Sequence, residues 1–122
     1  MIKVVGFVKK RPDLTREQFK EYWLKNHSKL EKESAENNPV RRIVASFATG
    51  EKVGYIQKDP PWDGMVELCF ASVEEMRAQL TGPQRGVMRE DEKNFIDVSE
   101  EAVFVVTEEY VMAEKTPRET GV

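Results

Sequence analysis

The sequence predicts one α+β domain of the ferredoxin-like class, in which a four-stranded antiparallel sheet carries helices on one face. Its 122 residues fit a single domain. Segments rich in β-branched and apolar residues alternate with helical segments in the order β-α-β-β-α-β, which packs most simply in this arrangement. The strand segments are apolar in both alternating phases, so we expect both faces of the sheet to be covered.

The first half of the chain is expected to contain a strand at residues 2–9, a long helix, and a second strand at 40–49. The helix begins at Thr15, because Thr15 and Gln18 fit a capping box, and it runs to about residue 36. Residues at helical spacing form its apolar face: Phe19, Tyr22, Trp23, Asn26, His27 and Leu30. The solvent-exposed face is expected to carry Lys20, Glu21, Lys25, Lys29, Glu31 and Lys32.

The second half of the chain is expected to hold two strands and two short helices. The expected segments are a loop at 51–64, a strand at 65–71, helices at 72–80 and 84–96, and a strand at 102–111. Ser72 opens the first of these helices with a second capping box, and Gly82-Pro83 separates the two. The domain therefore spans residues 1–112, and residues 113–122 form a polar tail.

The apolar character of both strand phases predicts a homodimer. In the first strand Val4 and Val8 alternate with Val5 and Phe7, and both sets are apolar. Two helices can cover only one face of the sheet, and large exposed apolar faces are rare on monomers. We therefore expect the sheets of two copies to pack face to face.

Composition and motifs exclude several classes of protein. The 19 basic and 22 acidic residues give a net charge of −3, whereas a nucleic-acid-binding protein should show a basic excess. No apolar run is long enough to span a membrane, and the N-terminus does not fit a signal peptide, so we expect a cytoplasmic protein. One cysteine, Cys69, fits a reducing compartment. Because no glycine-rich phosphate motif is present, and one histidine with one cysteine cannot make a zinc site, we expect no cofactor and no metal.

His27 is the first candidate for catalysis. It lies one turn after Trp23 on the apolar face of the helix, where a partly desolvated imidazole can accept or donate a proton. The alternative is a core histidine whose ring nitrogens are satisfied by hydrogen bonds.

Two carboxylates are further catalytic candidates. Glu67 lies in the middle of a strand and can act as an acid or base or orient a ligand; alternatively, it pairs with Arg41 or Arg42 on a neighbouring strand. Asp97 either faces a pocket or caps the turn into the last strand.

The residues expected to contact a ligand are mostly aromatic. Tyr55 and Trp62 on the long loop either form a lid over a ligand or pack the loop down. Cys69 is interpreted as a small apolar residue of its strand rather than a nucleophile. The predicted substrate-binding residues are Phe19, Tyr22, Trp23, Leu68, Phe70, Phe95, Tyr55 and Trp62.

Three blocks of the sequence, in this order, resemble the EthD-like family of dimeric α+β barrel proteins. The first is the stretch 14–23 followed by His27, with the pattern S/T-x-E-x-F-x-x-Y/W-W-x-x-x-H. The others are 63–70 with Ser72, and 94–97 followed by 105–109. The likeness covers about residues 2–110. It implies the same fold, its pairing as a dimeric α/β barrel, and a pocket between the first helix and the sheet with His27 at its edge.

The resemblance also implies a type of chemistry. Members of this family carry out cofactor-free proton transfer on cyclic or aromatic substrates, such as methylmuconolactone isomerisation and the dehydration or cyclisation of polyketides. Others have only a supporting role in ether degradation. The isomerases carry a second histidine, and a cysteine at the position of Leu68, that this sequence lacks.

We therefore expect a lyase, isomerase or cyclase that uses His27 on a hydrophobic cyclic or aromatic ligand of polyketide-like or lactone-like chemistry. One alternative is a non-catalytic ligand-binding or accessory protein of a degradation or biosynthetic pathway. The last alternative is a haem-degrading or quinol-oxidising enzyme, for which His27 is the only possible imidazole ligand.

Overall fold

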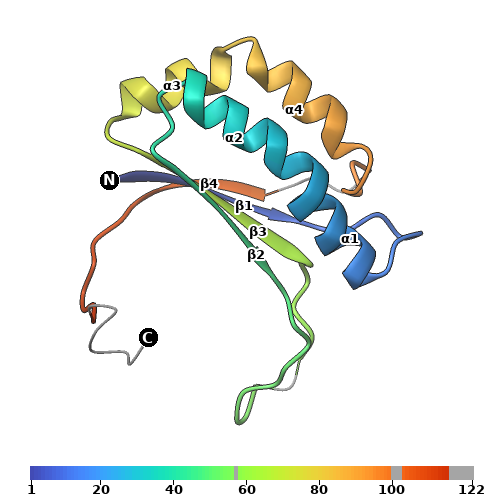
Figure 1. Ribbon diagram of the computed structural model, residues 1–122. Coiled ribbons are helices and arrows are strands. Elements are labelled where there is room, and N and C mark those ends of the chain that lie inside the picture. The colour runs from blue at the N-terminus through green and yellow to red at the C-terminus, as the bar shows by residue number, and fades with distance from the viewer. Residues whose placement is uncertain (57, 100–102, 116–122) are drawn as a thin grey trace.

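The computed structural model describes residues 1–56, 58–99 and 103–115 and contains a four-stranded sheet with helices on one side (Figure 1). The elements are β1 Ile2–Val8, α1 Arg16–Tyr22, the π-helical turn η1 Trp23–His27, α2 Ser28–Asn37, β2 Arg42–Phe47, β3 Gly64–Phe70, α3 Val73–Thr81, α4 Gln84–Glu92 and β4 Val103–Glu108. The strands lie in the order β2-β3-β1-β4, and each neighbouring pair is antiparallel. The predicted α+β, ferredoxin-like fold is confirmed.

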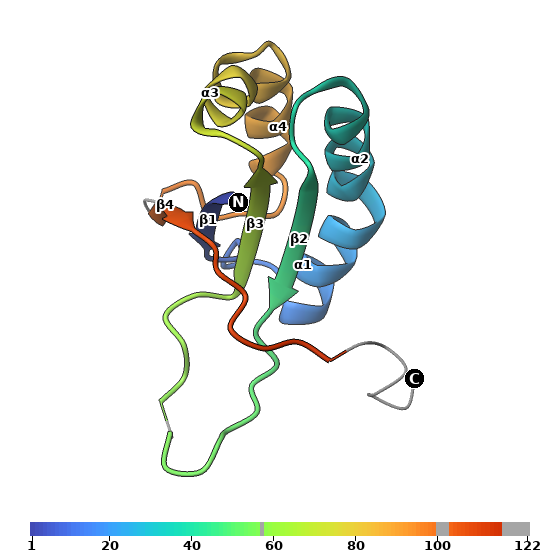
Figure 2. The ribbon, with the colours of Figure 1, turned by 90° about the vertical axis from the view of Figure 1, so that its left-hand side faces the viewer.

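The two faces of the sheet differ because successive side chains of a strand point to opposite sides. The face under the helices, here the covered face, carries Val4, Val8, Ile43, Val66, Leu68, Phe70, Phe104 and Val106. The other face, here the open face, carries Lys3, Val5, Phe7, Val44, Met65, Glu67, Cys69, Val103 and Val105. Figures 1 and 2 show that the helices lie on one side of the sheet only.

The core lies between the covered face and the helices, in two apolar clusters. Phe19 and Trp23 pack with Phe95 in one cluster, and their rings meet in edge and tilted arrangements with centroids 5.5 to 5.9 Å apart. Phe70 and Met76 belong to the other cluster. The rings of Phe19 and Trp23 also meet Phe47 of β2 edge-on, with centroids 5.9 and 5.3 Å away. Aromatic contacts of this kind add about 0.5–1.5 kcal/mol per pair beyond area burial, so they fix the first helix against the sheet.

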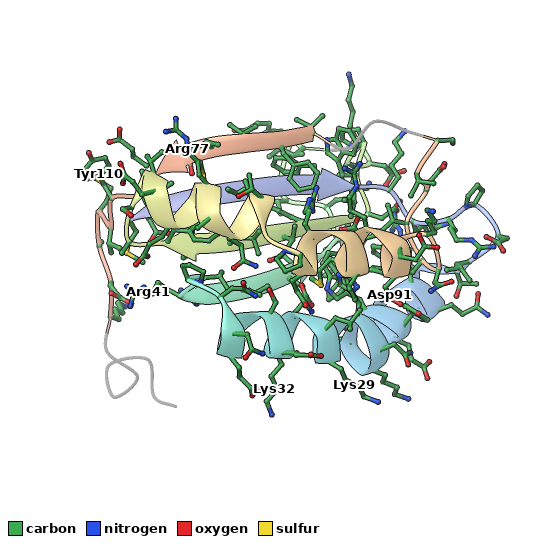
Figure 3. The ribbon with its side chains drawn as sticks, turned by 90° about the horizontal axis from the view of Figure 1, so that it is seen from above. Lys29, Lys32, Arg41, Arg77, Asp91 and Tyr110 are labelled. Atoms are coloured by element: carbon green, nitrogen blue, oxygen red, sulfur yellow. The ribbon has the colours of Figure 1, made fainter. Side chains whose placement is uncertain are left out.

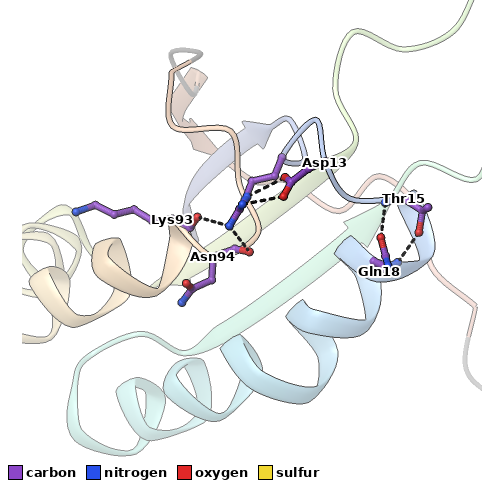
Figure 4. Close-up of polar contacts among 6 residues, drawn as sticks. Asp13, Thr15, Gln18, Lys93 and Asn94 are labelled. Carbon is purple, nitrogen blue, oxygen red and sulfur yellow. Dashed lines mark hydrogen bonds and ion pairs between the residues drawn. The ribbon is translucent and has the colours of Figure 1, made fainter.

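The first helix begins as the sequence predicts. The Thr15 hydroxyl accepts a hydrogen bond from the Gln18 N–H at 3.1 Å, and the Gln18 side-chain oxygen accepts one from the Thr15 N–H at 2.9 Å (Figure 4). At the start of α3, Ser72 likewise accepts from the Glu75 N–H at 3.1 Å. The Glu75 carboxylate, however, accepts from the Ala71 N–H at 3.2 Å, so only half of this second predicted box forms.

The π-helical turn changes which residues of the first helix face the sheet. The large or charged residues that it helps to bury are Phe19, Trp23, His27 and Glu31, at steps of four. In an α-helix of 3.6 residues per turn such steps drift around the axis, and the wider π turn compensates for this drift. The sequence prediction was therefore wrong for Asn26, which is exposed, and for Glu31, which is buried.

Some predicted segments extend beyond the elements that form. Helix α4 ends at Glu92 instead of continuing to residue 96, because Ile96 pairs with Lys10 in an isolated β-bridge. Strand β4 ends at Glu108 instead of continuing to residue 111. Residue 102, the predicted start of that strand, and residues 116–122 of the predicted tail lie outside the described residues.

Two connecting segments project from the open side of the sheet (Figures 1 and 2). One is the loop at residues 48–63 between β2 and β3, where the side chain of Tyr55 is 94% exposed. The other follows β4 and carries the exposed residues Tyr110, Val111 and Met112. In the described part of the chain, no helix combines the length and apolar character needed to cross a membrane.

Candidate functional site

A cavity of about 70 Å³ lies between the helices and the covered face. Its apolar wall is formed by Val8, Trp23, Ile43, Val66, Leu68, Leu80, Met88 and Phe104. Its polar lining consists of His27, Glu31, Ser34, Gln79, Gln84, Arg85 and Glu92. Ligand sites commonly combine an apolar wall with a few polar groups that fix orientation, so this cavity is the candidate functional site.

His27 is held in one orientation at the cavity wall. Its side chain is buried, and its Nδ1 lies 2.8 Å from Oδ2 of Asp91 on α4. The imidazole packs against Phe95, with ring centroids 4.9 Å apart. Because Asp91 engages Nδ1, the neutral ring carries its proton on Nδ1 and has Nε2 available to a ligand. The position of His27 in a π-helical turn is also typical of functional sites.

Asp91 is in turn fixed by several hydrogen bonds. The Tyr22 hydroxyl donates to its Oδ1 at 2.8 Å, and the Asn94 side chain donates to the same oxygen at 3.2 Å. Burial alone would raise the pKa of Asp91, but the hydrogen bonds from His27, Tyr22 and Asn94 together bring this pKa below its ordinary value. Figure 3 shows Asp91 on α4 at the side facing the first helix. An ionised Asp91 is therefore the acceptor for the His27 Nδ1–H group.

Two glutamates that line the cavity have raised pKa values, in contrast to Asp91. Burial raises the pKa of Glu31, whose Oε1 accepts a hydrogen bond from the Trp23 indole N–H at 2.9 Å. Burial also raises the pKa of Glu92, against the opposing charges of Arg85 and His27. Environments that move the pKa values of neighbouring carboxyl groups apart are a common basis for separating acid and base roles. Here they surround a single imidazole.

The lining of the cavity contains an amide with an unsatisfied oxygen. Gln79 on α3 donates from Nε2 to the Ser34 hydroxyl at 2.7 Å. Its Oε1 is buried and accepts no hydrogen bond within the described part of the chain.

The family of the chain follows from a comparison with protein-family models. The model of the EthD domain matches residues 11–99. This chain belongs to the EthD family. The match confirms the resemblance seen in the sequence, and it includes all residues that line the cavity except Val8 and Phe104. A comparison with curated proteins found no match.

Solved structures of low sequence identity share the fold of this EthD-family chain. An EthD family protein from Bacillus halodurans has a TM-score of 0.66 and 15% identity, covering 90% of this chain and 99% of its own. A dimeric ferredoxin-like protein of unknown function from Bacteroides fragilis has a TM-score of 0.60 and 14% identity, with coverage of 88% and 94%. A candidate antibiotic biosynthesis monooxygenase from Deinococcus radiodurans has a TM-score of 0.62 and 8% identity, with coverage of 95% and 99%. At these identities the likeness establishes the fold.

Several of the residues that the sequence singled out lie at or directly behind the cavity. His27, Trp23 and Leu68 line it, and Tyr22 donates to Asp91, the partner of His27. The remaining aromatic candidates on this side form the core behind it: Phe19, Phe70 and Phe95.

The structure places the other predicted site residues away from the cavity. Glu67 lies on the open face, where it accepts a hydrogen bond from Lys3 at 2.8 Å. Asp97 accepts a hydrogen bond from the Ser99 N–H at 3.0 Å, as in the turn that was the alternative interpretation. On the loop, the Tyr55 side chain is exposed. The ring centroid of Trp62 lies 6.2 Å from that of Phe7, which is on the open face.

Sequence reasoning missed the residues that α4 contributes. Met88, Asp91 and Glu92 lie at helical spacing from the predicted residue Phe95, in the segment that was predicted to be a helix. That spacing could have placed Asp91 and Glu92 on the same inner side as Phe95. Among the described residues, no group of three or more His, Cys, Asp or Glu side chains is arranged to hold a metal ion.

Proposed function

We propose that this chain is a cofactor-independent lyase, isomerase or cyclase that moves a proton on a hydrophobic cyclic or aromatic small molecule bound in the cavity. The observation that carries the proposal is the 2.8 Å contact between His27 Nδ1 and Asp91, next to a mostly apolar cavity. A single well-placed general base typically contributes about 10² to 10⁴ in rate.

In this proposal His27 is the general base. Its Nε2 takes a proton from a carbon of the ligand next to a carbonyl or another activating group, and the resulting imidazolium is stabilised by the carboxylate of Asp91. The Tyr22 and Asn94 hydrogen bonds keep that carboxylate ionised and in place. Asp91 is thus a positioning residue that sets the tautomer of His27.

Glu31 and Glu92 supply the complementary acid function. Because burial raises the pKa values of both carboxyl groups, each favours its protonated form more than an exposed glutamate does. A protonated carboxyl group can donate to the oxygen of the ligand on which negative charge develops, or to a departing hydroxyl. The base and the acids then act on one ligand from different walls of the cavity.

The size of the cavity limits the ligand. A volume of about 70 Å³ is smaller than the roughly 150 Å³ of an apolar cavity that holds benzene, and sites for drug-sized ligands measure about 300–1,000 Å³. Helix α4 is the wall that can yield, since within this fully described helix no residue is buried. Any ring compound is therefore expected to bind with displacement of α4, and a polycyclic ligand with a larger displacement.

The proposal includes a homodimer in which the open faces of two copies pack together. Val103 and Val105 on this face are each 43% exposed, and the β2–β3 loop and the segment after β4 project on the same side (Figure 2). The Bacteroides fragilis protein of the same fold is dimeric, which supports this arrangement. A second sheet packed on this face would remove the valines from water. The burial would stabilise the dimer by about 25 cal/mol for each Å² of apolar surface buried.

A probe that responds to any well-placed base tests the function without knowledge of the natural substrate. 5-Nitrobenzisoxazole loses a proton from carbon while its N–O bond breaks, and the coloured phenolate product is easily measured. We expect His27→Gln to lower turnover of this probe by about 10² to 10⁴, because glutamine keeps hydrogen bonding but cannot take the proton. Asn26→Gln, a change at the exposed neighbour in the same turn, is the control and should leave turnover unchanged.

Two results would reject this function. Turnover that persists in His27→Gln would show that the proton moves elsewhere. Binding of aromatic ligands by the wild-type protein, without turnover of the probe or of a panel of cyclic ketones and lactones, would instead identify a non-catalytic ligand-binding protein.

A further inference from the structure

Two polar residues of different helices line the cavity, and one of them, Ser34, lies about two helical turns after His27. Ser34 lies on α2 and is 1% exposed, and Gln79 lies on α3. The Gln79 Nε2 donates to the Ser34 hydroxyl at 2.7 Å, which fixes the amide. Gln79 lines the cavity, and with Nε2 engaged in this way Oε1 is the atom of its amide that has no partner among the described residues.

The Gln79 oxygen lacks a hydrogen-bond donor. It is fully buried, and within the described residues no N–H or O–H group donates to it. Buried side-chain oxygens without a partner are rare in folded proteins, because their lost hydration is not replaced. An orphaned acceptor that lines a cavity therefore indicates a donor group of a ligand.

We infer that the cavity recognises a hydroxyl group of its ligand, which donates a hydrogen bond to Gln79 Oε1. This inference rests on the proposed function for the choice of cavity and names the class of ligand: a neutral ring compound that carries a phenolic or alcoholic hydroxyl. The hydroxyl end of the ring lies at Ser34 and Gln79, and the opposite part of the ring lies toward His27.

The other groups of the cavity favour a neutral hydroxyl over a charged group. A carboxylate has no proton to donate to Gln79 and would meet the carboxyl groups of Glu31 and Glu92. An ammonium group would lose its hydration beside the apolar side chains of Val66, Leu68 and Leu80. The raised pKa values of Glu31 and Glu92 favour their neutral forms, which pair less well with a cation. A ketone or an ether offers no hydrogen to the amide oxygen.

Phenol and toluene form a matched pair of probes, since they differ by a hydroxyl in place of a methyl group. In an apolar cavity toluene binds more tightly, because it loses less hydration. We expect the wild-type protein to bind phenol at least as tightly as toluene. Binding is followed by NMR through the indole N–H of Trp23, which lies at the cavity wall, with the Trp62 indole on the loop as internal reference. Tighter binding of toluene by the wild-type protein would overturn the inference.

Two glutamine variants locate the effect. Gln79→Met keeps the length of the side chain and removes the acceptor, and it should shift the ratio of the two dissociation constants about tenfold toward toluene. Gln84→Met changes a second glutamine of the cavity that has no orphaned oxygen, and it should leave the ratio within about twofold. A ratio that is unchanged in Gln79→Met, or that shifts equally in both variants, contradicts the inference. The wild-type ratio remains a test if Gln79→Met does not fold.

A third variant separates this inference from the proposed function. His27→Gln should lower turnover of 5-nitrobenzisoxazole by about 10² to 10⁴ yet retain the preference for phenol, because the hydroxyl is bound by Gln79 and not by His27. A preference for phenol in a protein without turnover would therefore reject the catalytic role alone. Turnover without a preference for phenol would reject the hydroxyl site alone.

Discussion

The two faces of the sheet place similar side chains in different environments. On the covered face Glu31 and Glu92 reach toward the sheet from helices, are shielded from water, and have raised pKa values. On the open face Glu67 projects from β3 itself and pairs with Lys3, whose pKa is raised by hydrogen bonds with Glu109 and Glu67. Burial is the main influence on the carboxyl groups of the covered face, whereas Glu67 of the open face is in an ion pair. Burial thus favours the protonated form of the two carboxyl groups on the covered side.

The position of a residue along its strand decides which face of the sheet its side chain occupies. Glu67 and Leu68 are neighbours in β3, yet Leu68 lines the cavity and Glu67 lies on the other side of the sheet. A shift of one residue reverses the side of every side chain in a strand. The register of a strand must therefore be known before a charged residue in its middle can be assigned to a site.

The largest expected effect contrasts one residue from each face. If the covered face holds the chemistry, Glu67→Gln should change turnover of the benzisoxazole probe by less than tenfold, whereas His27→Gln lowers it by about 10² to 10⁴. Steady-state kinetics of the two variants checks this. Equal losses would restore Glu67 as an acid or base, as the sequence alone suggested.

An intermediate effect is expected from charges placed on the two sides of one edge strand. Val105 lies on the open face and Val106 on the covered side, and they are 43% and 55% exposed. Val105→Asp should convert a dimer into a 14.1 kDa monomer at micromolar concentration, because it places a carboxylate between the sheets. Val106→Asp should remain dimeric. Sedimentation equilibrium distinguishes them, and a monomeric wild-type protein would reject the paired sheets.

The smallest expected effect concerns the pH dependence of stability. The folded protein raises the pKa of Glu31, so the ionised form destabilises the fold at high pH, and this cost disappears below the ordinary pKa of 4.5. Glu31→Gln retains an acceptor for the Trp23 indole and should stabilise the protein at pH 8 by about 1 kcal/mol, the usual size for one substitution. The two proteins should become alike at pH 4.

Urea unfolding at both pH values measures this difference, with Glu33→Gln, at an exposed position of the same helix, as the control. A Glu31→Gln protein that is less stable than wild type at pH 8 would show that the carboxylate is stabilised in the fold, contrary to this account.

The sequence predicted the elements whose signals are local. The Thr15 capping box, the apolar and β-branched run of β1, and the break at Gly82-Pro83 each depend on residues close together in the chain, and each appears in the structure. The order of elements then limited the topology to a few arrangements. The family pattern around His27 pointed to the same helix.

The site was predicted only in part, because its partners are distant in sequence. Asp91 lies 64 residues from His27, and no local pattern pairs the two. The π-helical turn at Trp23–His27 has no propensity signal, and it moved Glu31 from the solvent side to the cavity. Chain segments that meet only on folding decide which polar groups share a cavity.

The tautomer of His27 tests the central claim most directly. The chain has one histidine, so long-range proton–nitrogen NMR of the imidazole reports on this residue alone. Near pH 8 the account predicts a proton on Nδ1, donated to Asp91, and an unprotonated Nε2 available to the cavity. Asp91→Ala should remove this preference. A neutral ring with its proton on Nε2 in the wild-type protein, or the same spectrum in Asp91→Ala, would contradict the account.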